Sequence, residues 1–199
     1  MGKRTVDLVL ASLALVVTAP VLLMAMLWVR LDSPGPVLFR QERVGQHGRL
    51  FRIHKLRTMG IADAQSPGPA ITGHGDHRIT AAGRWLRRYR IDELPQLIDV
   101  LRGDMSLVGP RPEVPRFVAL YPPELRACVL AVRPGITDPA SLEFIDEARL
   151  LEGSADPERT YVETILPRKV QRQAEYVRRA NLATDLSVLV RTLRVLLAR

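Results

Sequence analysis

The segment 83–112 brings together residue types that could do chemistry on a phosphate ester. Two adjacent carboxylates, Asp92 and Glu93, follow a run of arginines where the sequence predicts the start of a helix, with Asp92 as its N-cap. Helix N-terminal amides attract phosphate oxygens, and a divalent ion can bridge a phosphate to a carboxylate. The structural alternative is that Asp92 only caps the helix and Glu93 only complements its dipole.

Cations near these acids could bind a phosphate. Arg111 lies in a Pro-Arg-Pro turn, whose fixed backbone would present the guanidinium in a set direction. Lys55 and Arg57 end a predicted strand, and the alternation of side chains places both on one face. An exposed arginine on a rigid turn and a solvated strand face are the structural alternatives. The predicted phosphate-binding set is Lys55, Arg57, Arg87, Arg88 and Arg111.

Composition limits the classes of partner. The 199 residues carry 29 Lys and Arg against 21 Asp and Glu, a net charge of +8, which suits nucleic acid, an anionic membrane or phosphate-bearing substrates. Aromatic residues make up only 5% of the chain, which argues against single-stranded nucleic acid as the partner. The single cysteine, Cys128, excludes an internal disulfide and a cysteine-based zinc cluster.

An uncharged apolar run from Leu8 to Val29 is long enough to cross a membrane. Pro20 lies near its middle, and a proline there removes a backbone hydrogen bond and bends a helix. Cationic residues flank both ends, so charge does not select a crossing direction. Two interpretations stay open: a bent helix that enters and leaves on the same side, and a plain spanning anchor.

The rest of the chain predicts an α+β fold that is mostly helical. Two alternating stretches, 37–44 and 49–56, predict a β-hairpin, and residues 59–76 predict a long loop. Thr80 is the expected cap of a short basic helix, and Gly103 is expected to end the helix after Asp92. Residues 105–115 predict a loop. Further helices are expected at 123–132, 140–151, 157–166, 168–181 and 185–197, with Thr184 capping the last.

Several motifs together resemble the bacterial sugar transferases, the monotopic phosphoglycosyl transferases in their short form. The similarity extends in order over nearly the whole chain, which makes it highly specific. The matching motifs are 33–45 (SPGPVLFRQERVG), 51–59 (FRIHKLRTM), 91–97 (IDELPQL), 103–112 (GDMSLVGPRP) and 134–137 (PGIT).

The resemblance implies a reaction, a site and a location. Such enzymes move a sugar-1-phosphate from a nucleoside-diphosphate sugar, here expected to be a UDP-sugar, to undecaprenyl phosphate, and they require Mg²⁺. Asp92 would be the nucleophile that forms a covalent phosphosugar and a magnesium ligand, and Glu93 would assist the lipid phosphate. Residues 1–32 would form a re-entrant membrane helix and residues 33–199 a compact catalytic domain with amphipathic surface helices. That domain would lie on the cytoplasmic face of the bacterial inner membrane, in contact with its lipids.

Two departures from the family pattern and one rival remain. The helix-breaking pair is Ala19-Pro20 instead of Ser-Pro, and the segment beginning at Asp138 replaces a Gly-Trp or Gly-Leu sequence. The sugar, the glycan pathway and the choice between monomer and homodimer are left open. The rival is a non-enzymatic, membrane-anchored basic scaffold that binds lipid or nucleic acid, and it leaves Asp92 and Glu93 unexplained.

Overall fold

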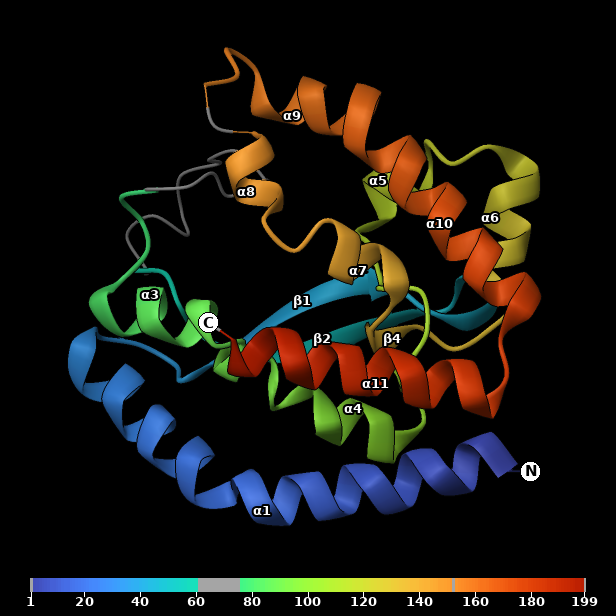
Figure 1. The fold of residues 1–199 in the computed structure, drawn as a ribbon. Helices are drawn as coiled ribbons and strands as arrows, with labels where there is room; N and C mark the ends of the chain where they lie inside the picture. The colour runs from blue at the N-terminus through green and yellow to red at the C-terminus, as the bar shows by residue number, and fades with distance from the viewer. Residues whose placement is uncertain (1, 61–75, 152, 199) are drawn as a thin grey trace.

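A long helix, α1, lies along one side of a helical body that is built on a β-hairpin (Figure 1). The computed structural model describes residues 2–60, 76–151 and 153–198, so the predicted loop at 59–76 lies mostly outside the described residues. The helices with an α label are α1 (Gly2–Asp32), α3 (Ala81–Arg88), α4 (Gln96–Arg102), α5 (Pro115–Val118), α6 (Pro123–Leu130), α7 (Pro139–Glu143), α8 (Glu147–Leu150), α9 (Pro157–Thr160), α10 (Leu166–Arg179) and α11 (Leu182–Leu197).

Helix α1 is one continuous helix of 31 residues with Pro20 inside it, and it changes direction within its length (Figure 1). It is long and apolar enough to cross a membrane, and only 11% of its apolar stretch of 18 residues is buried in the rest of the chain. Low burial separates it from a typical core helix, whose apolar surface is covered by neighbouring elements.

The predicted hairpin is confirmed. Strands β1 (Leu38–Val44) and β2 (Leu50–Leu56) pair antiparallel, with Leu38 opposite Leu56 and Val44 opposite Leu50. The turn between them contains a short 3₁₀ segment, η1 (Gln46–Gly48), in which Gly48 adopts a φ of 80°. A positive φ is readily accessible to glycine, so the residue type fits the turn.

A second, parallel pair of strands was not predicted. Strands β3 (Ser106–Val108) and β4 (Gly135–Thr137) pair in parallel. Strand β3 lies in the stretch 105–115, which the sequence predicts as a loop. The backbones then approach so closely at Gly109 and Gly135 that a Cβ on Gly135 would lie 2.1 Å from the Gly109 nitrogen. Short strands of three residues carry too little alternation to be recognised from the sequence.

Three helix predictions are corrected. The stretch predicted as one helix at 140–151 is two, α7 and α8. The two predicted at 157–166 and 168–181 form one helical run, in which a π segment, η3 (Tyr161–Ile165), precedes Pro167. A proline lacks the N–H of a regular turn, and a π segment relieves that defect without ending the helix. Finally, α11 is capped by Asn181, and Thr184 completes the capping box from the third helical position.

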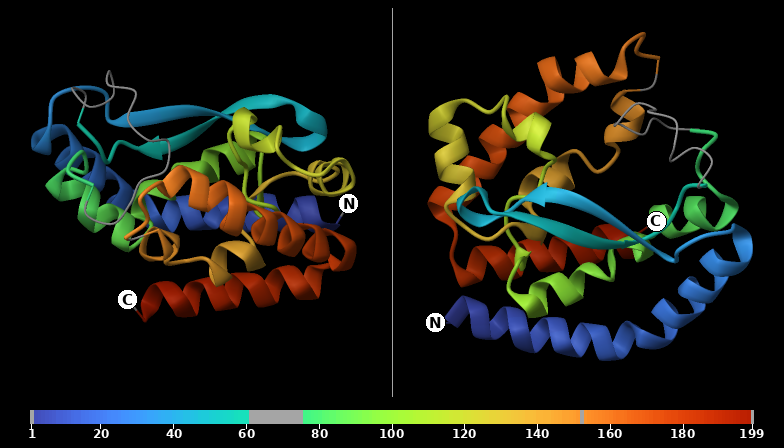
Figure 2. Two further views of the ribbon diagram at one scale, coloured as in Figure 1. Left: turned by 90° about the horizontal axis from the view of Figure 1, so that it is seen from above. Right: turned by 180° about the vertical axis from the view of Figure 1, so that it is seen from behind.

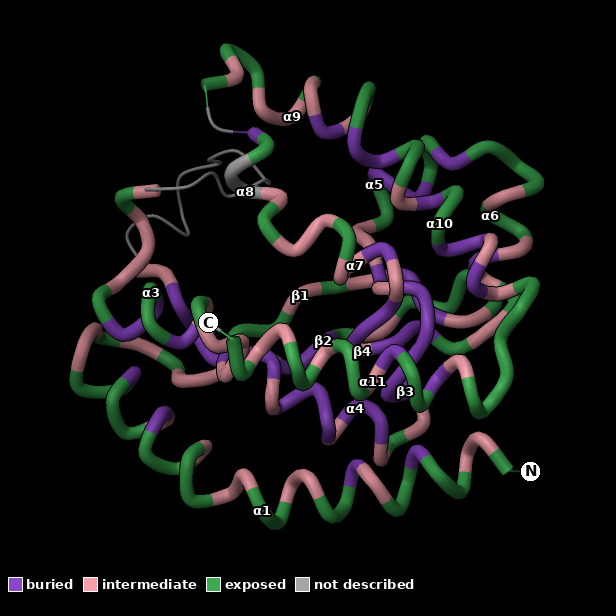
Figure 3. The backbone as a smooth tube through the Cα atoms, in the orientation of Figure 1, coloured by how far each residue is buried: buried purple, intermediate pink, exposed green. Residues whose placement is uncertain are grey.

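Three apolar clusters join these elements, and Figure 3 shows where buried residues lie along the chain. One connects the end of β1 to α5, α6 and α10. The others hold α1: Ala11 packs with β2, α4, β3 and α11, whereas Ala25 and Val29 pack with Leu56 and Leu86. Both halves of α1 are therefore attached to the body, and Figure 2 shows α1 following it from two further directions.

Candidate functional site

The two acids lie in a 3₁₀ turn, η2 (Ile91–Glu93), and not at a helix N-cap. Arg90 precedes the turn in the left-handed conformation with a φ of 56°, and its carbonyl accepts a hydrogen bond from the Glu93 N–H. The following helix, α4, begins at Gln96 after Pro95, and no side chain caps it. The prediction that Asp92 is an N-cap is therefore wrong, because the chain is already in a helical turn at that residue.

Asp92 is a buried carboxylate with a free oxygen. Asp92 is only 5% exposed to solvent, and its Oδ1 has no hydrogen-bond partner in the described part of the chain. Burial raises the pKa of the Asp92 carboxyl above its ordinary value, and the charge of Lys55 opposes that shift. A buried carboxylate oxygen without a partner is costly unless a ligand completes it. This atom can accept an ion or a reacting group.

Glu93 is the opposite case, because cations surround it. Its Oε1 accepts a hydrogen bond from the Arg111 guanidinium, one from Lys55 Nζ at 2.9 Å and one from Arg90 Nη1 at 3.2 Å. Burial would raise the pKa of the Glu93 carboxyl, but the charges of Arg111 and Lys55 outweigh it and hold the pKa well below its ordinary value. Glu93 is therefore ionised at neutral pH.

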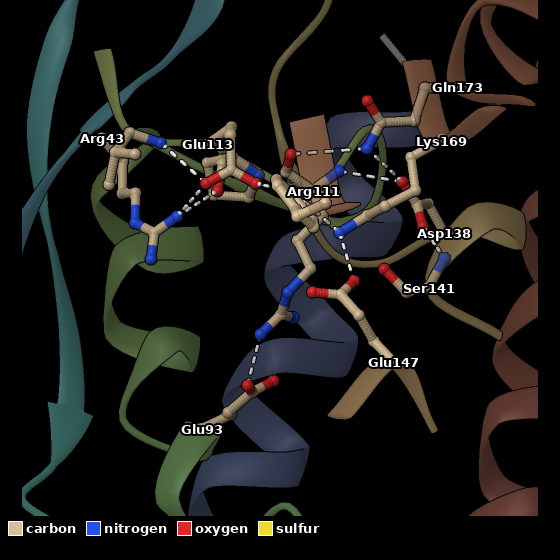
Figure 4. Close-up of polar contacts among 12 residues, drawn as sticks. Arg43, Glu93, Arg111, Glu113, Asp138, Ser141, Glu147, Lys169 and Gln173 are labelled. Carbon is tan, nitrogen blue, oxygen red and sulfur yellow. Dashed lines mark hydrogen bonds and ion pairs between the residues drawn. The ribbon is translucent and has the colours of Figure 1, made fainter. Parts of the chain in front are cut away.

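Lys55 and Arg111 reach this point from different elements. Lys55 lies on β2, opposite Phe39, and burial lowers the pKa of its ammonium while Glu93 partly restores it. Arg111 follows β3, and its Nη1 also donates to the Ile136 carbonyl at 2.8 Å. Figure 4 shows the Arg111 side chain extended toward Glu93. The structure thus brings Lys55, Arg111, Asp92 and Glu93 together.

Arg87 is near the acids, whereas Arg57 and Arg88 have other surroundings. Arg87 Nε donates to Thr58 Oγ1 at 2.8 Å; burial lowers its pKa, and the charge of Asp92 opposes that shift. Arg57 lies beyond the end of β2 and donates to main-chain carbonyls, including that of Ser33 at 2.8 Å, where α1 ends. Arg88 is exposed, with its guanidinium 5.7 Å from the centroid of the Tyr89 ring.

Three contributors were missed by the sequence-based prediction. Arg90 was recognised as part of the arginine run but not as a site residue, because nothing in its type indicates a left-handed backbone. Asp138 and Gln173 hold the Arg111 main chain: the Arg111 N–H donates to Asp138 Oδ2 at 2.9 Å, and Gln173 Nε2 donates to the same oxygen at 2.9 Å. Their separation from Arg111 along the chain leaves no local signal.

A divalent ion could be held here by Asp92. The described residues contain no group of three or more His, Cys, Asp or Glu side chains that could hold a metal ion. Mg²⁺ does not require one, since it is commonly bound through one or two carboxylates together with water and substrate phosphates. The buried, unpartnered Oδ1 of Asp92 fits that mode of binding.

The sequence model of the bacterial sugar transferase family matches residues 1–199 of this chain. This chain belongs to the bacterial sugar transferase family. As a family member it is a transferase. A similar relative is the UDP-glucose:undecaprenyl-phosphate glucose-1-phosphate transferase of Caulobacter vibrioides, which is 42% identical over 200 residues, covering 99% of this chain and 70% of the relative.

Two further sugar transferases extend the comparison. The UDP-N-acetylgalactosamine-undecaprenyl-phosphate N-acetylgalactosaminephosphotransferase of Aeromonas hydrophila is 36% identical over 98% of this chain and 43% of its own length. The UDP-glucose:undecaprenyl-phosphate glucose-1-phosphate transferase of Escherichia coli is 43% identical over 68% of this chain and 29% of its own length. The chain therefore spans less than half of some relatives, and these relatives differ in the sugar that their names give.

Proposed function

We propose that this chain transfers a sugar-1-phosphate from a UDP-sugar to undecaprenyl phosphate and releases UMP. The observation that carries the proposal is the pairing of Asp92, whose buried Oδ1 has no partner in the described structure, with Glu93, which is fixed by cations. The names of the relatives support the substrate classes. They support no single sugar, because glucose and N-acetylgalactosamine both occur among them.

The proposed reaction has two displacements at one phosphorus atom. An Asp92 oxygen attacks the phosphorus that bears the sugar, a bond between that oxygen and phosphorus forms, and the bond to the UMP oxygen breaks with its electron pair leaving on UMP. An oxygen of undecaprenyl phosphate then attacks the same phosphorus and releases the Asp92 carboxylate. Covalent catalysis of this kind divides one difficult transfer into two easier steps.

The charges around the acids suit a diphosphate. Lys55, Arg87, Arg90 and Arg111 supply four positive charges. The nearby carboxylates are Asp92, Glu93 and, behind Arg111, Asp138, so a positive surplus remains for phosphate oxygens. Preorganised cations stabilise the charge that develops on a leaving phosphate. Mg²⁺, when bound through Asp92, would add further neutralisation of that charge. Glu93 would keep Lys55 and Arg111 in place before the substrate arrives.

We infer that α1 is re-entrant and that the body lies on the cytoplasmic face of the inner membrane. Polar contacts attach both ends of α1 to the same body: Asp7 accepts hydrogen bonds from Ser106 Oγ and the Leu107 N–H, and Asp32 accepts one from the Ala82 N–H. A straight spanning helix would separate its two ends by the thickness of the bilayer. Cations near both ends agree with a cytoplasmic position for each.

The test of the reaction is UMP release. The purified chain is mixed with Mg²⁺, undecaprenyl phosphate and a panel of UDP-sugars, alongside Asp92→Asn and the matched control Asp156→Asn, an exposed helix cap. We expect release by wild type and control and almost none by Asp92→Asn. Without the lipid acceptor, intact-protein mass spectrometry should find one sugar phosphate added to wild type and control but not to Asp92→Asn. Full release by Asp92→Asn, or none by wild type with any UDP-sugar, would contradict the proposal.

A further inference from the structure

Arg111 lies between two prolines, and the backbone of this Pro-Arg-Pro turn offers a single hydrogen-bond donor. Pro110 and Pro112 lack an N–H, so the Arg111 N–H is the sole main-chain donor of this tripeptide. That donor bonds Asp138 Oδ2 at 2.9 Å, and the Arg111 carbonyl faces Gln173 Nε2 at 3.5 Å. The main-chain groups of Arg111 itself therefore face two side chains, Asp138 between β4 and α7 and Gln173 from α10. The neighbouring carbonyls of Pro110 and Pro112 accept from the Gly135 N–H at 3.0 Å and from Arg43 Nη1 at 3.2 Å.

Asp138 is fully buried, with 0% exposure, and each of its oxygens is used. Oδ2 accepts from the Arg111 N–H and from Gln173 Nε2, and Oδ1 accepts from the Ser141 N–H in the first turn of α7. Figure 4 shows Asp138 and Gln173 on one side of Arg111 and Glu93 on the other. One buried carboxylate thus connects the Arg111 turn, α7 and α10.

We propose that Asp138 is a positioning residue for Arg111, held in turn by Gln173. The Arg111 guanidinium meets Glu93 and the Ile136 carbonyl, and Asp138 holds the one N–H of the turn from which that side chain extends. A shift of about 1 Å in a positioned group can cost on the order of 100-fold in rate. The inference rests on the proposed function, because Arg111 is expected to bind the donor phosphates there.

The competing explanation is that Asp138 only caps α7 and joins α7 to α10. Asparagine distinguishes the two, since it caps helices as well as aspartate does. In Asp138→Asn, the amide oxygen would keep the bond to the Ser141 N–H and the amide nitrogen would face the Arg111 N–H, donor against donor. Gln173 could turn its Oε1, which has no partner in the described structure, toward that nitrogen.

The experiment therefore compares Asp138→Asn with the double variant Asp138→Asn/Gln173→Glu. We expect kcat for UMP release to fall about 10- to 100-fold in the single variant, following the range for misplaced groups. In the double variant the carboxylate introduced at position 173 would accept from the asparagine amide more strongly than the turned Gln173 amide does, so thermal stability should return toward wild type while kcat stays low. Recovery of both stability and kcat in the double variant would overturn the inference.

A second measurement shows whether Asp138 acts through Arg111. Asp138→Asn is added to Arg111→Ala, and a shared pathway predicts strongly non-additive effects, with less than about a threefold further loss. Equal fold losses in both backgrounds would overturn the inference. Asp156→Asn is the matched control, an Asp-to-Asn change at an exposed cap. Full activity of Asp138→Asn would overturn the positioning role alone, whereas no release by wild type would overturn the proposed function and the inference with it.

Discussion

Two neighbouring carboxyl groups, Asp92 and Glu93, have pKa values shifted in opposite directions. Burial dominates at Asp92 and raises its pKa, whereas Arg111, Lys55 and Arg90 together outweigh burial at Glu93 and lower its pKa. The difference arises because the cations donate to Glu93 and leave Asp92 Oδ1 without a partner among the described residues. Groups in one site whose pKa values are driven apart often have different catalytic roles. This contrast supports Asp92 as the reacting oxygen and Glu93 as the group that orders the cations.

Replacing Lys55 with methionine should slow the reaction. The change removes a 2.9 Å hydrogen bond to Glu93 and one positive charge near Asp92. We expect kcat for UMP release to fall roughly 100-fold, as for the loss of one preorganised donor. The control is Arg52→Met, which removes an exposed cation from the same strand and should leave kcat near wild type. Equal rates in both variants would contradict the role of Lys55.

The carboxyl group of Glu113 should make the free energy of unfolding depend on pH. Burial would raise the pKa of this carboxyl, but the charges of Arg43 and Lys169 hold it below its ordinary value, and Tyr161 Oη donates to it at 2.8 Å. Its folded pKa is lower than its unfolded one. The stability from ionised Glu113 is therefore complete above the unfolded pKa and is lost as pH falls through the folded pKa.

The measurement compares Glu113→Gln with wild type by urea unfolding in detergent between about pH 7 and pH 3, which brackets the ordinary carboxyl range. We expect the variant to be less stable by about 1–3 kcal/mol at neutral pH, the range for leaving buried polar groups without a partner. The difference should shrink as pH falls, because wild type loses its carboxylate while the variant has none at this position. A constant difference over the whole range would show that the charge of Glu113 contributes nothing.

At the scale of elements, the C-terminal end of α1 is held by a residue that directly follows β2. Arg57 follows β2 and donates to the carbonyls of Ser33 at 2.8 Å and Val29 at 3.3 Å. Carbonyl groups at a helix C-terminus lack helical partners, and a cation there is favourable. An arginine predicted to bind substrate is thus placed where it joins the apolar helix α1 to the hairpin.

Arg57→Gln should therefore reduce stability more than catalysis. We expect a loss of about 2 kcal/mol in unfolding free energy, the value for hydrogen bonds to a charged donor, and a kcat for the folded enzyme within a few-fold of wild type. Arg49→Gln, at an exposed position in the same hairpin, is the control and should change neither. A kcat lowered at least tenfold with unchanged stability would instead support Arg57 as a substrate-binding residue.

At the scale of the whole molecule, the body holds α1 from both ends. Lys3 Nζ donates to the Val108 carbonyl at 2.9 Å, and Arg4 Nη1 donates to the Val100 carbonyl at 2.8 Å. Asp32 is bonded to the start of α3 at the other end. The acids of η2 lie in the same body, so the attachment of α1 also fixes the turn that carries Asp92 and Glu93 relative to the apolar helix.

Pro20→Leu should favour a straight α1. The change restores a backbone N–H and removes the proline's clash with the preceding turn, a bias of about 3 kcal/mol. Gly2→Cys in a Cys128→Ala background reports the side of the N-terminus by labelling with an impermeant maleimide. We expect no labelling from outside the cell with Pro20 and a labelled fraction with Pro20→Leu, whereas Val21→Leu should behave as the parent. Labelling of the parent from outside would contradict re-entry.

Local sequence patterns determined the elements whose signal is carried within them. Alternation and a Gly-rich turn predicted the hairpin, Thr80 capped α3, and Gly103 ended α4 with a φ of 91°. The uncharged run of α1 and the closeness of the acids to a Pro-Arg-Pro turn were likewise readable, because both depend on composition over a short stretch. These features need no knowledge of which distant segments meet.

Only the tertiary structure decided which cations meet Glu93 and which oxygen stays free. Lys55 and Arg57 share a predicted strand face, yet of these two only Lys55 reaches Glu93, because Arg57 lies past the end of β2 and faces the end of α1. Asp138 and Gln173 meet Arg111 through contacts between β4, α7 and α10. These contacts depend on how segments far apart in the chain pack and bury one another. Packing energies of that kind produce no periodic pattern in the sequence, so the sequence alone does not predict the contacts.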